Sequence, residues 1–357
     1  MNRINALKQS AFKNDKLNYF LVLNSANLTY FTSFPGATAL LIPEQGESIL
    51  YVSAVNYEQA EAETSGLTVE LLKRGENLME KIANYATPEK PTKLAVDSVS
   101  IEFWRALAKA VGGEERLEPA GNFIRDLRKV KDQREIQLIR EACNLTNIGM
   151  KVAAQTIRTG IKEKDVAAEV EYAMRKKGSD GTAFDTIIAS GISSAFPHGS
   201  CSDRTIRNGD LVVVDLGATY KFYRSDMTRT FVAGKASEKQ KKIYEVVERA
   251  QQKAFESIRP RISAKKVDAE ARQVIEAAGF GEYFVHNLGH GVGLEVHEAP
   301  ILSPDSKDIL ASGNVVTDEP GIYLPGNGGV RIEDTVLITK DGAEKLTLGS
   351  YGLTTER

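Results

Sequence analysis

Hydrophobic residues in the first third of the chain fall into short runs, separated by segments with apolar positions at helical spacing. Such runs predict strands, and the spaced positions predict helices. The predicted strands are 19–23, 39–42, 48–52 and 94–97, and the predicted helices are 55–64, 75–86 and 100–111. This alternation is typical of an α/β domain. We therefore expect a smaller domain over residues 1–127, ending near the charged stretch 125–132, and a second domain over 128–357.

Two long amphipathic segments follow, and each predicts a helix with one buried face. In the first, the apolar positions among charged residues are Ile136, Ile139, Leu145 and Val152. In the second, Ser237 is a suitable N-cap, because its hydroxyl can accept from unpaired backbone N–H groups at a helix start. The apolar stripe after Ser237 comprises Ile243, Val246, Val247, Ala250, Ala254 and Ile258.

These two helices open two copies of one sequence pattern. The segment 157–169 matches 258–270 at an offset of 101 residues (258 − 157). In each copy a glycine follows, Gly178 or Gly279, which is suited to the C-terminus of a helix. Each copy then continues into a predicted hairpin, 206–228 or 310–335. Only two copies are present, so we expect a domain with pseudo-twofold symmetry and a site between its halves, not a solenoid.

Each predicted hairpin carries two acids at matching places. Asp215 aligns with Glu319 (319 − 215 = 104), and Asp226 lies opposite Glu333 (333 − 226 = 107) because the second loop is longer. Four carboxylates cannot share a dry site without cations, since each uncompensated buried charge costs several kcal/mol. Two divalent ions would balance the four charges. A solvated hairpin is the alternative, but it leaves unexplained the apolar run 211–214 that ends directly in an acid.

Alternation along the strands places further polar residues beside these acids, because residues two apart share a face. The sets expected to point together are Arg224, Asp226 and Thr228, then Glu319 and Tyr323, then Arg331 and Glu333. On the opposite face of the last strand, Val330 and Ile332 are expected to face the core.

All four histidines of the chain lie in the loops before the two hairpins: His198, His286, His290 and His297. We assign His290 to metal and treat His286 as a residue behind the ligands or in the core, because the neighbouring glycines oppose a helical histidine pair. His198 and His297 hold corresponding places (297 − 198 = 99), which suits one histidine on each side of a substrate. Their alternative is to be ordinary loop histidines.

Composition excludes several other classes of function. The formal net charge of −2 gives no reason to expect nucleic acid or a membrane surface as partner. No apolar run approaches the ~20 residues that span a bilayer, and the polar start is not typical of a signal peptide. The only cysteines, Cys143 and Cys201, fit a reducing cytoplasm without disulfides. Although Cys201 is near His198, no acid–histidine arrangement supports a nucleophilic cysteine.

Four carboxylates and one imidazole argue against calcium and against a thiolate-type structural zinc site. Mn²⁺, Co²⁺, Fe²⁺ and Zn²⁺ all stay open. Two such ions ~3.5–4 Å apart would bridge a water, lower its pKa and polarise a scissile carbonyl. A nearby carboxylate can take the proton, while histidines stabilise the oxyanion and help the amine leave.

At these residues the sequence resembles the pita-bread-fold metallopeptidases, and within them the prolidase and aminopeptidase P group. The resemblance covers about 130–345 and is carried by the motifs 215–230, 289–293, 297–298, 319–323 and 329–334. It implies five metal ligands, with Asp226 and Glu333 bridging the ions: Asp215, Asp226, His290, Glu319 and Glu333. It also implies that His198 and His297 contact substrate and transition state, that Tyr323 and Arg331 serve proton movement and positioning, and that Glu319 accepts the water's proton.

Residues 1–127 more loosely resemble the creatinase/prolidase N-terminal domain, which implies a homodimer that acts on short peptides with proline at the second position. The compact length favours a prolidase, which splits Xaa-Pro dipeptides, over an aminopeptidase P, which acts on longer Xaa-Pro peptides. A methionine aminopeptidase usually lacks such a domain, and intact ligands oppose both a metal-free creatinase-like hydrolase and a non-catalytic binding protein. The native metal, Mn²⁺ or Co²⁺ foremost, and the preferred first residue stay open.

Overall fold

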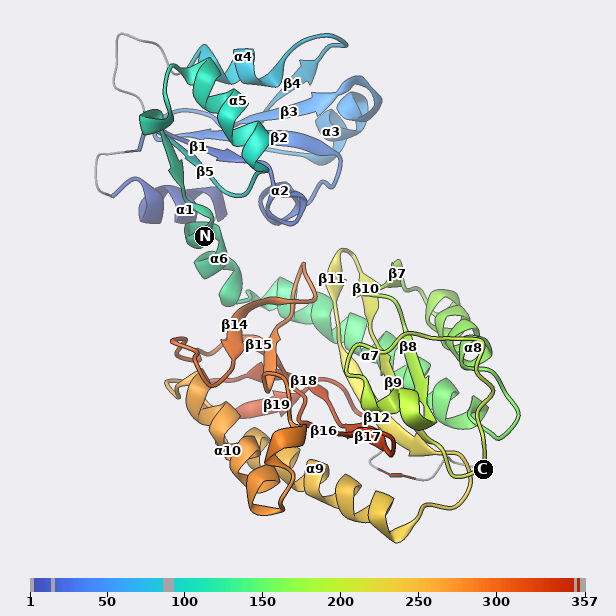
Figure 1. The fold of residues 1–357 in the computed structure, drawn as a ribbon. Coiled ribbons are helices and arrows are strands. Elements are labelled where there is room, and N and C mark those ends of the chain that lie inside the picture. The colour runs from blue at the N-terminus through green and yellow to red at the C-terminus, as the bar shows by residue number, and fades with distance from the viewer. Residues whose placement is uncertain (1–2, 14–16, 86–92, 350–351, 354–357) are drawn as a thin grey trace. The chain divides into compact units, whose positions relative to one another are not determined.

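The computed structural model describes residues 3–13, 17–85, 93–349 and 352–353. The chain divides into two compact units, residues 1–128 and 129–357 (Figure 1). The predicted boundary lies one residue before this division. Each unit is described by itself below.

The first unit is built on a six-stranded mixed sheet in the order β4-β3-β2-β1-β5-β6. Its strands are β1 (Tyr19–Val22), β2 (Ala37–Pro43), β3 (Ile49–Ser53), β4 (Thr68–Leu72), β5 (Leu94–Val96) and β6 (Leu117–Pro119). Its helices are α1 (Arg3–Ala11), α2 (Ser25–Thr32), α3 (Tyr57–Glu63), α4 (Leu78–Ala83), α5 (Ile101–Val111) and α6 (Gly121–Lys129). All four predicted strands and three predicted helices are present, although residue 86 lies outside the described residues.

Four helices of the second unit form two successive pairs, α7 (Gln133–Thr156) with α8 (Glu163–Lys176) and α9 (Glu238–Ser257) with α10 (Ala264–Ala277). Ser237 caps α9, as predicted, and forms a reciprocal capping box there; Asp132 forms the same arrangement at the start of α7. Gly178 and Gly279 follow α8 and α10 with φ of 107° and 82°. This left-handed conformation favours glycine, so both predicted helix ends are confirmed.

The strands of the second unit repeat in the same way. The first half contains β7 (Gly181–Thr182), β8 (Ile187–Ser190), β9 (Leu211–Leu216), β10 (Ala218–Tyr220), β11 (Tyr223–Arg224) and β12 (Met227–Val232). The second half contains β13 (Gly289–Gly291), β14 (Glu298–Leu302), β15 (Val315–Asp318), β16 (Gly321–Leu324), β17 (Gly328–Arg331), β18 (Asp334–Ile338) and β19 (Ala343–Lys345). In each half an antiparallel pair, β9–β12 or β15–β18, encloses a second antiparallel pair in chain order, β10–β11 or β16–β17. The predicted duplication is therefore confirmed in the order and pairing of the elements.

Two apolar clusters support the two halves. One joins α7 and α8 to β8, β9 and β12, and the other joins α9 and α10 to β15, β16 and β18. Val330 and Ile332, predicted to face the core, are fully buried in the second cluster. In Figure 1 the two helix pairs lie on the outer side of the strands, which leaves the hairpins near the middle of the unit.

Candidate metal centre and cavity

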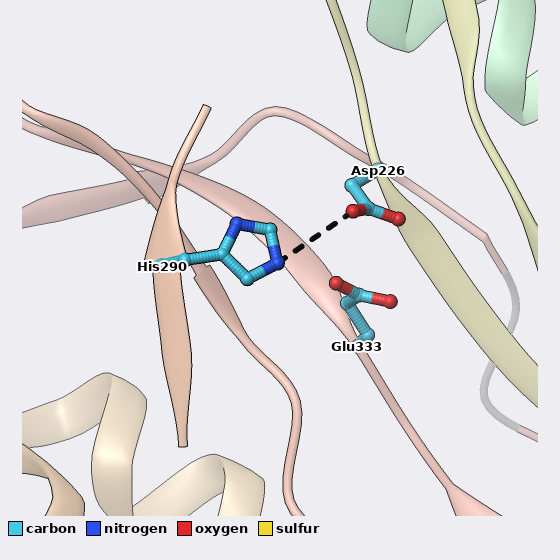
Figure 2. Close-up of side chains that lie close together, drawn as sticks. All are labelled: Asp226, His290 and Glu333. Carbon is cyan, nitrogen blue, oxygen red and sulfur yellow. Dashed lines mark ion pairs between the residues drawn. The ribbon is translucent and has the colours of Figure 1, made fainter. Parts of the chain in front are cut away.

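Three predicted ligands come together from three separate segments of the second unit. Asp226 lies between β11 and β12, His290 is the middle residue of β13, and Glu333 lies between β17 and β18. Each offers a ligand atom, and these atoms lie within 4.8 Å of one another. Figure 2 shows the imidazole of His290 directed at the two carboxylates, with its Nε2 3.8 Å from Asp226 Oδ2.

Glu319, directly after β15, extends this group on the side of His290. The Nε2 atom of His290 lies 3.2 Å from Glu319 Oε1. One hydroxyl holds both residues, because Thr317 Oγ1 donates to Glu319 Oε1 at 3.0 Å and accepts the backbone N–H of His290 at 3.0 Å. Thr317 was not predicted as a site residue, although strand alternation puts it on the same face as Glu319.

Asp215, near the end of β9, is held by a single arginine. Arg331 Nη2 donates to Asp215 Oδ2 at 2.6 Å. The other oxygen, Oδ1, is buried and has no hydrogen-bond partner among the described residues. A buried carboxylate oxygen without a donor is costly, so this atom is suited to a cation.

A hydroxyl also links Arg331 to Glu333. Thr228 Oγ1 donates to Glu333 Oε2 at 2.6 Å and accepts Arg331 Nε at 3.0 Å. Thr228 therefore lies with the acids, as strand alternation predicted. Arg224 is held elsewhere, because its Nη1 donates to the carbonyl of Ala183 at 2.7 Å. Strands β11 and β12 belong to different sheets, so strict alternation does not continue from Arg224 to Asp226.

The carboxylates are crowded enough to require positive charge. Burial, together with the charges of neighbouring acids, raises the pKa values of Asp226 and Glu333 well above their ordinary range. Burial also raises the pKa of Asp215, although Arg331 opposes this. Burial acts in the same direction on Glu319, but the hydrogen bond and charge of His290 outweigh it and bring the Glu319 pKa to about 2. Four carboxylates and one imidazole fit divalent transition-metal ions as ligands, and one carboxylate oxygen, Asp215 Oδ1, has no hydrogen-bond partner among the described residues.

A second chain of contacts runs from Arg331 away from the acids. Arg331 Nη1 donates to the Tyr323 hydroxyl at 2.8 Å, and that hydroxyl lies 2.9 Å from His286 Nε2. An arginine only donates, so the hydroxyl proton of Tyr323 is directed to Nε2. The Nδ1 atom of His286 then carries the imidazole proton, which it donates to the Asn287 carbonyl at 2.8 Å. Burial lowers the pKa of His286, in keeping with a neutral ring.

The acids and histidines of this site border one cavity of about 760 Å³ within the second unit. All five predicted ligands line it, together with His198, His286, His297 and Arg331. The His297 ring centroid is 4.2 Å from that of His290, and burial lowers the pKa of His297. The apolar part of the wall comprises Phe184, Ile187, Val296 and Ile301. This combination of apolar wall and converging polar groups is typical of a small-ligand site.

The comparison with known proteins agrees with this geometry. Residues 137–340 match the metallopeptidase family M24, and residues 3–130 match the creatinase/prolidase N-terminal domain. The chain belongs to the M24 metallopeptidases. It is 46% identical over 329 residues to the Xaa-Pro dipeptidase of Pyrococcus horikoshii, with 92% of each chain covered. It is 43% identical to the Xaa-Pro dipeptidase of Pyrococcus furiosus, with 91% of this chain and 92% of that one covered.

Solved structures of similar proteins share the fold over nearly the whole chain. The crystal structure of the prolidase from Pyrococcus horikoshii has a TM-score of 0.91 at 42% identity and covers 99% of this chain and 100% of that one. The X-Pro aminopeptidase from Thermotoga maritima has a TM-score of 0.85 at 35% identity, with 95% and 97% covered. The resemblance to pita-bread peptidases is thus confirmed, and the protein is a peptidase with a prolidase-type fold.

One further feature of this M24 site, the buried Glu163, was outside the sequence prediction. Glu163, at the start of α8, is fully buried and accepts the backbone N–H and hydroxyl of Ser190 and of Ser202 at 2.6–2.9 Å. Glu163 therefore holds together the two ends of the loop that carries His198. Cys201 donates to the Thr186 carbonyl at 2.9 Å, and burial raises its pKa, which opposes a nucleophilic role.

No helix in the described part of the chain is long and apolar enough to cross a membrane.

Proposed function

We propose that this M24 peptidase is an Xaa-Pro dipeptidase that uses two divalent metal ions, Mn²⁺ or Co²⁺, with Zn²⁺ or Fe²⁺ as alternatives. The convergence of Asp226, His290 and Glu333 within 4.8 Å carries the proposal. Asp215 and Glu319 complete the ligand set, and Asp226 and Glu333 would serve both ions. Curated relatives at 43–46% identity over most of the chain are Xaa-Pro dipeptidases, which supports the substrate class.

When bound, such ions would lower the pKa of a water and polarise the scissile carbonyl. The protein's own part begins with Glu319. His290 lowers its pKa to about 2 in the metal-free protein, so the carboxylate is ionised at neutral pH, and we assign it to accept the proton of an attacking water. The hydrogen bond from Thr317 Oγ1 to Glu319 Oε1 fixes the orientation of the acceptor.

Two histidines on the cavity wall would contact the substrate. His297 packs against His290, and its lowered pKa keeps the ring neutral near pH 7, so an imidazole N–H can donate to the oxygen of the tetrahedral intermediate. His198 lines the same cavity and would hold the peptide from another side. Tyr323 and Arg331 act behind the reacting groups: Arg331 fixes Asp215, and Tyr323 connects Arg331 to His286.

Replacing either substrate-facing histidine with alanine should lower kcat by roughly 10²–10⁴-fold, because a proton-transfer or oxyanion contact is lost. Steady-state hydrolysis of Ala-Pro by His198→Ala and His297→Ala checks this, with bound metal measured in each preparation. Metal content should stay at the wild-type value. Asp203→Ala, in the exposed Asp203–Lys164 pair, is the control and should leave kcat unchanged. Wild-type kinetics in both histidine variants would show that His198 and His297 are ordinary loop histidines without a catalytic role.

The substrate proposal is tested by comparing the dipeptide Ala-Pro with the tripeptide Ala-Pro-Ala in metal-free, Mn²⁺-loaded and Co²⁺-loaded protein. We expect kcat/KM to favour the dipeptide at least about tenfold, and no hydrolysis without metal. The alternative is an Xaa-Pro aminopeptidase, which the fold of the Thermotoga maritima enzyme supports. Preference for the tripeptide would select that alternative, and failure to cleave either peptide would reject both.

Three further parts of the proposal concern the whole protein. The domain over residues 1–127 would pair two chains as a homodimer, the substrates would be short peptides, and the protein would act in the cytoplasm. The free thiols of Cys143 and Cys201 are consistent with a reducing compartment. Light scattering of the purified protein tests the dimer, because a single-chain mass at micromolar concentration would contradict it.

A further inference from the structure

A pair of charged residues on α10 forms a rigid unit beside the cavity. Arg272 donates to Asp268 through two parallel hydrogen bonds, Nε to Oδ2 and Nη2 to Oδ1, each 2.9 Å long. The two residues are one helical turn apart, and Asp268 is only 1% exposed. Bidentate pairs of this kind fix the plane of the guanidinium group.

This pair holds the backbone of the segment 284–288, which leads into β13. Arg272 Nη1 donates to the Phe284 carbonyl at 3.2 Å, and Nη2 donates to the His286 carbonyl at 3.1 Å. Asp268 Oδ1 accepts the N–H of Leu288 at 3.1 Å. The backbone is thus held on both sides of His286.

The same pair also supports the His286 ring. The Arg272 guanidinium carbon lies 4.3 Å from the centroid of the Phe284 ring. That ring in turn meets the His286 imidazole edge-to-face, with centroids 5.1 Å apart and planes at 90°. A cation over one aromatic face and an aromatic edge on the imidazole leave His286 little freedom to rotate.

We propose that Arg272 and Asp268 are positioning residues for the peptidase reaction and act through His286. By holding the neutral imidazole 2.9 Å from the Tyr323 hydroxyl, they keep that hydroxyl available to Arg331, which in turn fixes Asp215. The inference rests on the proposed function, because that function assigns the roles of Tyr323, Arg331 and Asp215.

The duplication of the domain supports this assignment. At the repeat offset of 101 residues, Asp268 and Arg272 correspond to Ala167 and Glu171 on α8. The first half therefore folds the same helix pair without such an ion pair. The pair occurs in the half that carries His286, so the helical architecture itself does not require it.

A double-mutant cycle on the metal-loaded full-length protein tests the inference, with Arg272→Ala, His286→Ala and the double variant assayed on Ala-Pro. We expect Arg272→Ala to lower kcat about 10–100-fold with bound metal unchanged, as for residues that orient active-site groups from behind. In the His286→Ala background the same change should cost less than about twofold, because the residue through which Arg272 acts is gone. Arg272→Lys should fall between, since lysine cannot form the bidentate pair. Arg249→Ala, an exposed arginine on the neighbouring α9, is the control.

Three results would overturn the inference: an unchanged kcat in Arg272→Ala, a full multiplicative effect in the double variant, or a loss that follows metal content. If Arg272→Ala does not fold, Arg272→Lys replaces it in the same cycle. A crystal structure of the variant provides a readout independent of activity, and an unmoved His286 ring at 2.9 Å from the Tyr323 hydroxyl would also overturn it. Failure of the proposed function is distinguishable, because the wild-type protein would then cleave no Xaa-Pro peptide.

Discussion

Glu333→Ala is expected to lower kcat/KM for Ala-Pro by at least about 10³-fold and to reduce the bound metal below two ions per chain. Under the proposed assignment this carboxylate serves both ions, so its loss removes a ligand from each and several kcal/mol of transition-state stabilisation. Its neighbours cannot compensate. Thr228 Oγ1 loses the carboxylate oxygen to which it donates at 2.6 Å, and Asp226, fixed at its own backbone position, cannot take the place of Glu333.

Metal analysis of the dialysed variant, together with initial rates, measures both effects. Asp226→Ala should behave in the same way. Glu344→Ala is a matched control, because Glu344 pairs with Arg140 on the surface, and exposed pairs contribute little. Near wild-type turnover with two ions still bound in Glu333→Ala would disprove the bridging role.

Removal of metal by a chelator is expected to abolish hydrolysis, and Mn²⁺ or Co²⁺ should restore it with an affinity that weakens as the pH falls. The reason is the raised pKa values of Asp226 and Glu333, since each group must lose its proton before it binds a cation. The imidazole of His290 adds to this. Burial lowers its pKa, but its contacts with Glu319 outweigh burial and raise it, so this ring must also release a proton.

The sign of the stability effect follows from the same shifts. Acids with raised pKa values bind more protons in the folded, metal-free protein than in the unfolded chain, so the stability of that form falls as the pH rises. A bound cation removes the repulsion that causes this fall. The increase in Tm on adding Mn²⁺ should therefore be larger at about pH 8 than at about pH 5. Calorimetry should also detect proton release, and a pH-independent affinity would contradict the prediction.

Local signals in the sequence were sufficient to predict much of the second unit. Ser237 with Gln240 forms the capping box at the start of α9, and Gly279 marks the end of α10 because its φ of 82° suits glycine. The apolar run that ends at Asp215 identified a buried strand with an acid at its end. These patterns depend on neighbouring residues alone, so no knowledge of the tertiary structure was needed.

Elements that depend on distant partners were missed. Helix α2 has the sequence SANLTYFT, with polar and β-branched residues that show no clear apolar stripe, and packing within the first unit stabilises it. Strand β4 lies at the edge of the sheet, and all its residues are partly or fully exposed, so its pattern is weak. Both were outside the prediction.

The same distinction applies to the site. The acids and histidines were identified by residue type and by the repeat, whereas the hydroxyl of Thr317 gains its importance from contact with His290, 27 positions away. The Arg272 contacts with Phe284 and His286 span 12 and 14 positions through a loop. Serine, threonine and arginine are common in ordinary surface positions, so their types alone gave no signal.

The division of the proposed ligands between the two copies of the repeat has a consequence for the chain as a polymer. Asp215 and Asp226 belong to the first copy, and His290, Glu319 and Glu333 belong to the second, with 63 residues of chain between Asp226 and His290 (290 − 226 − 1). Cations held by both sets of ligands would act as a reversible cross-link between the two copies of the repeat. A protease cut between β12 and α9 would then yield fragments whose separation depends on the free metal concentration.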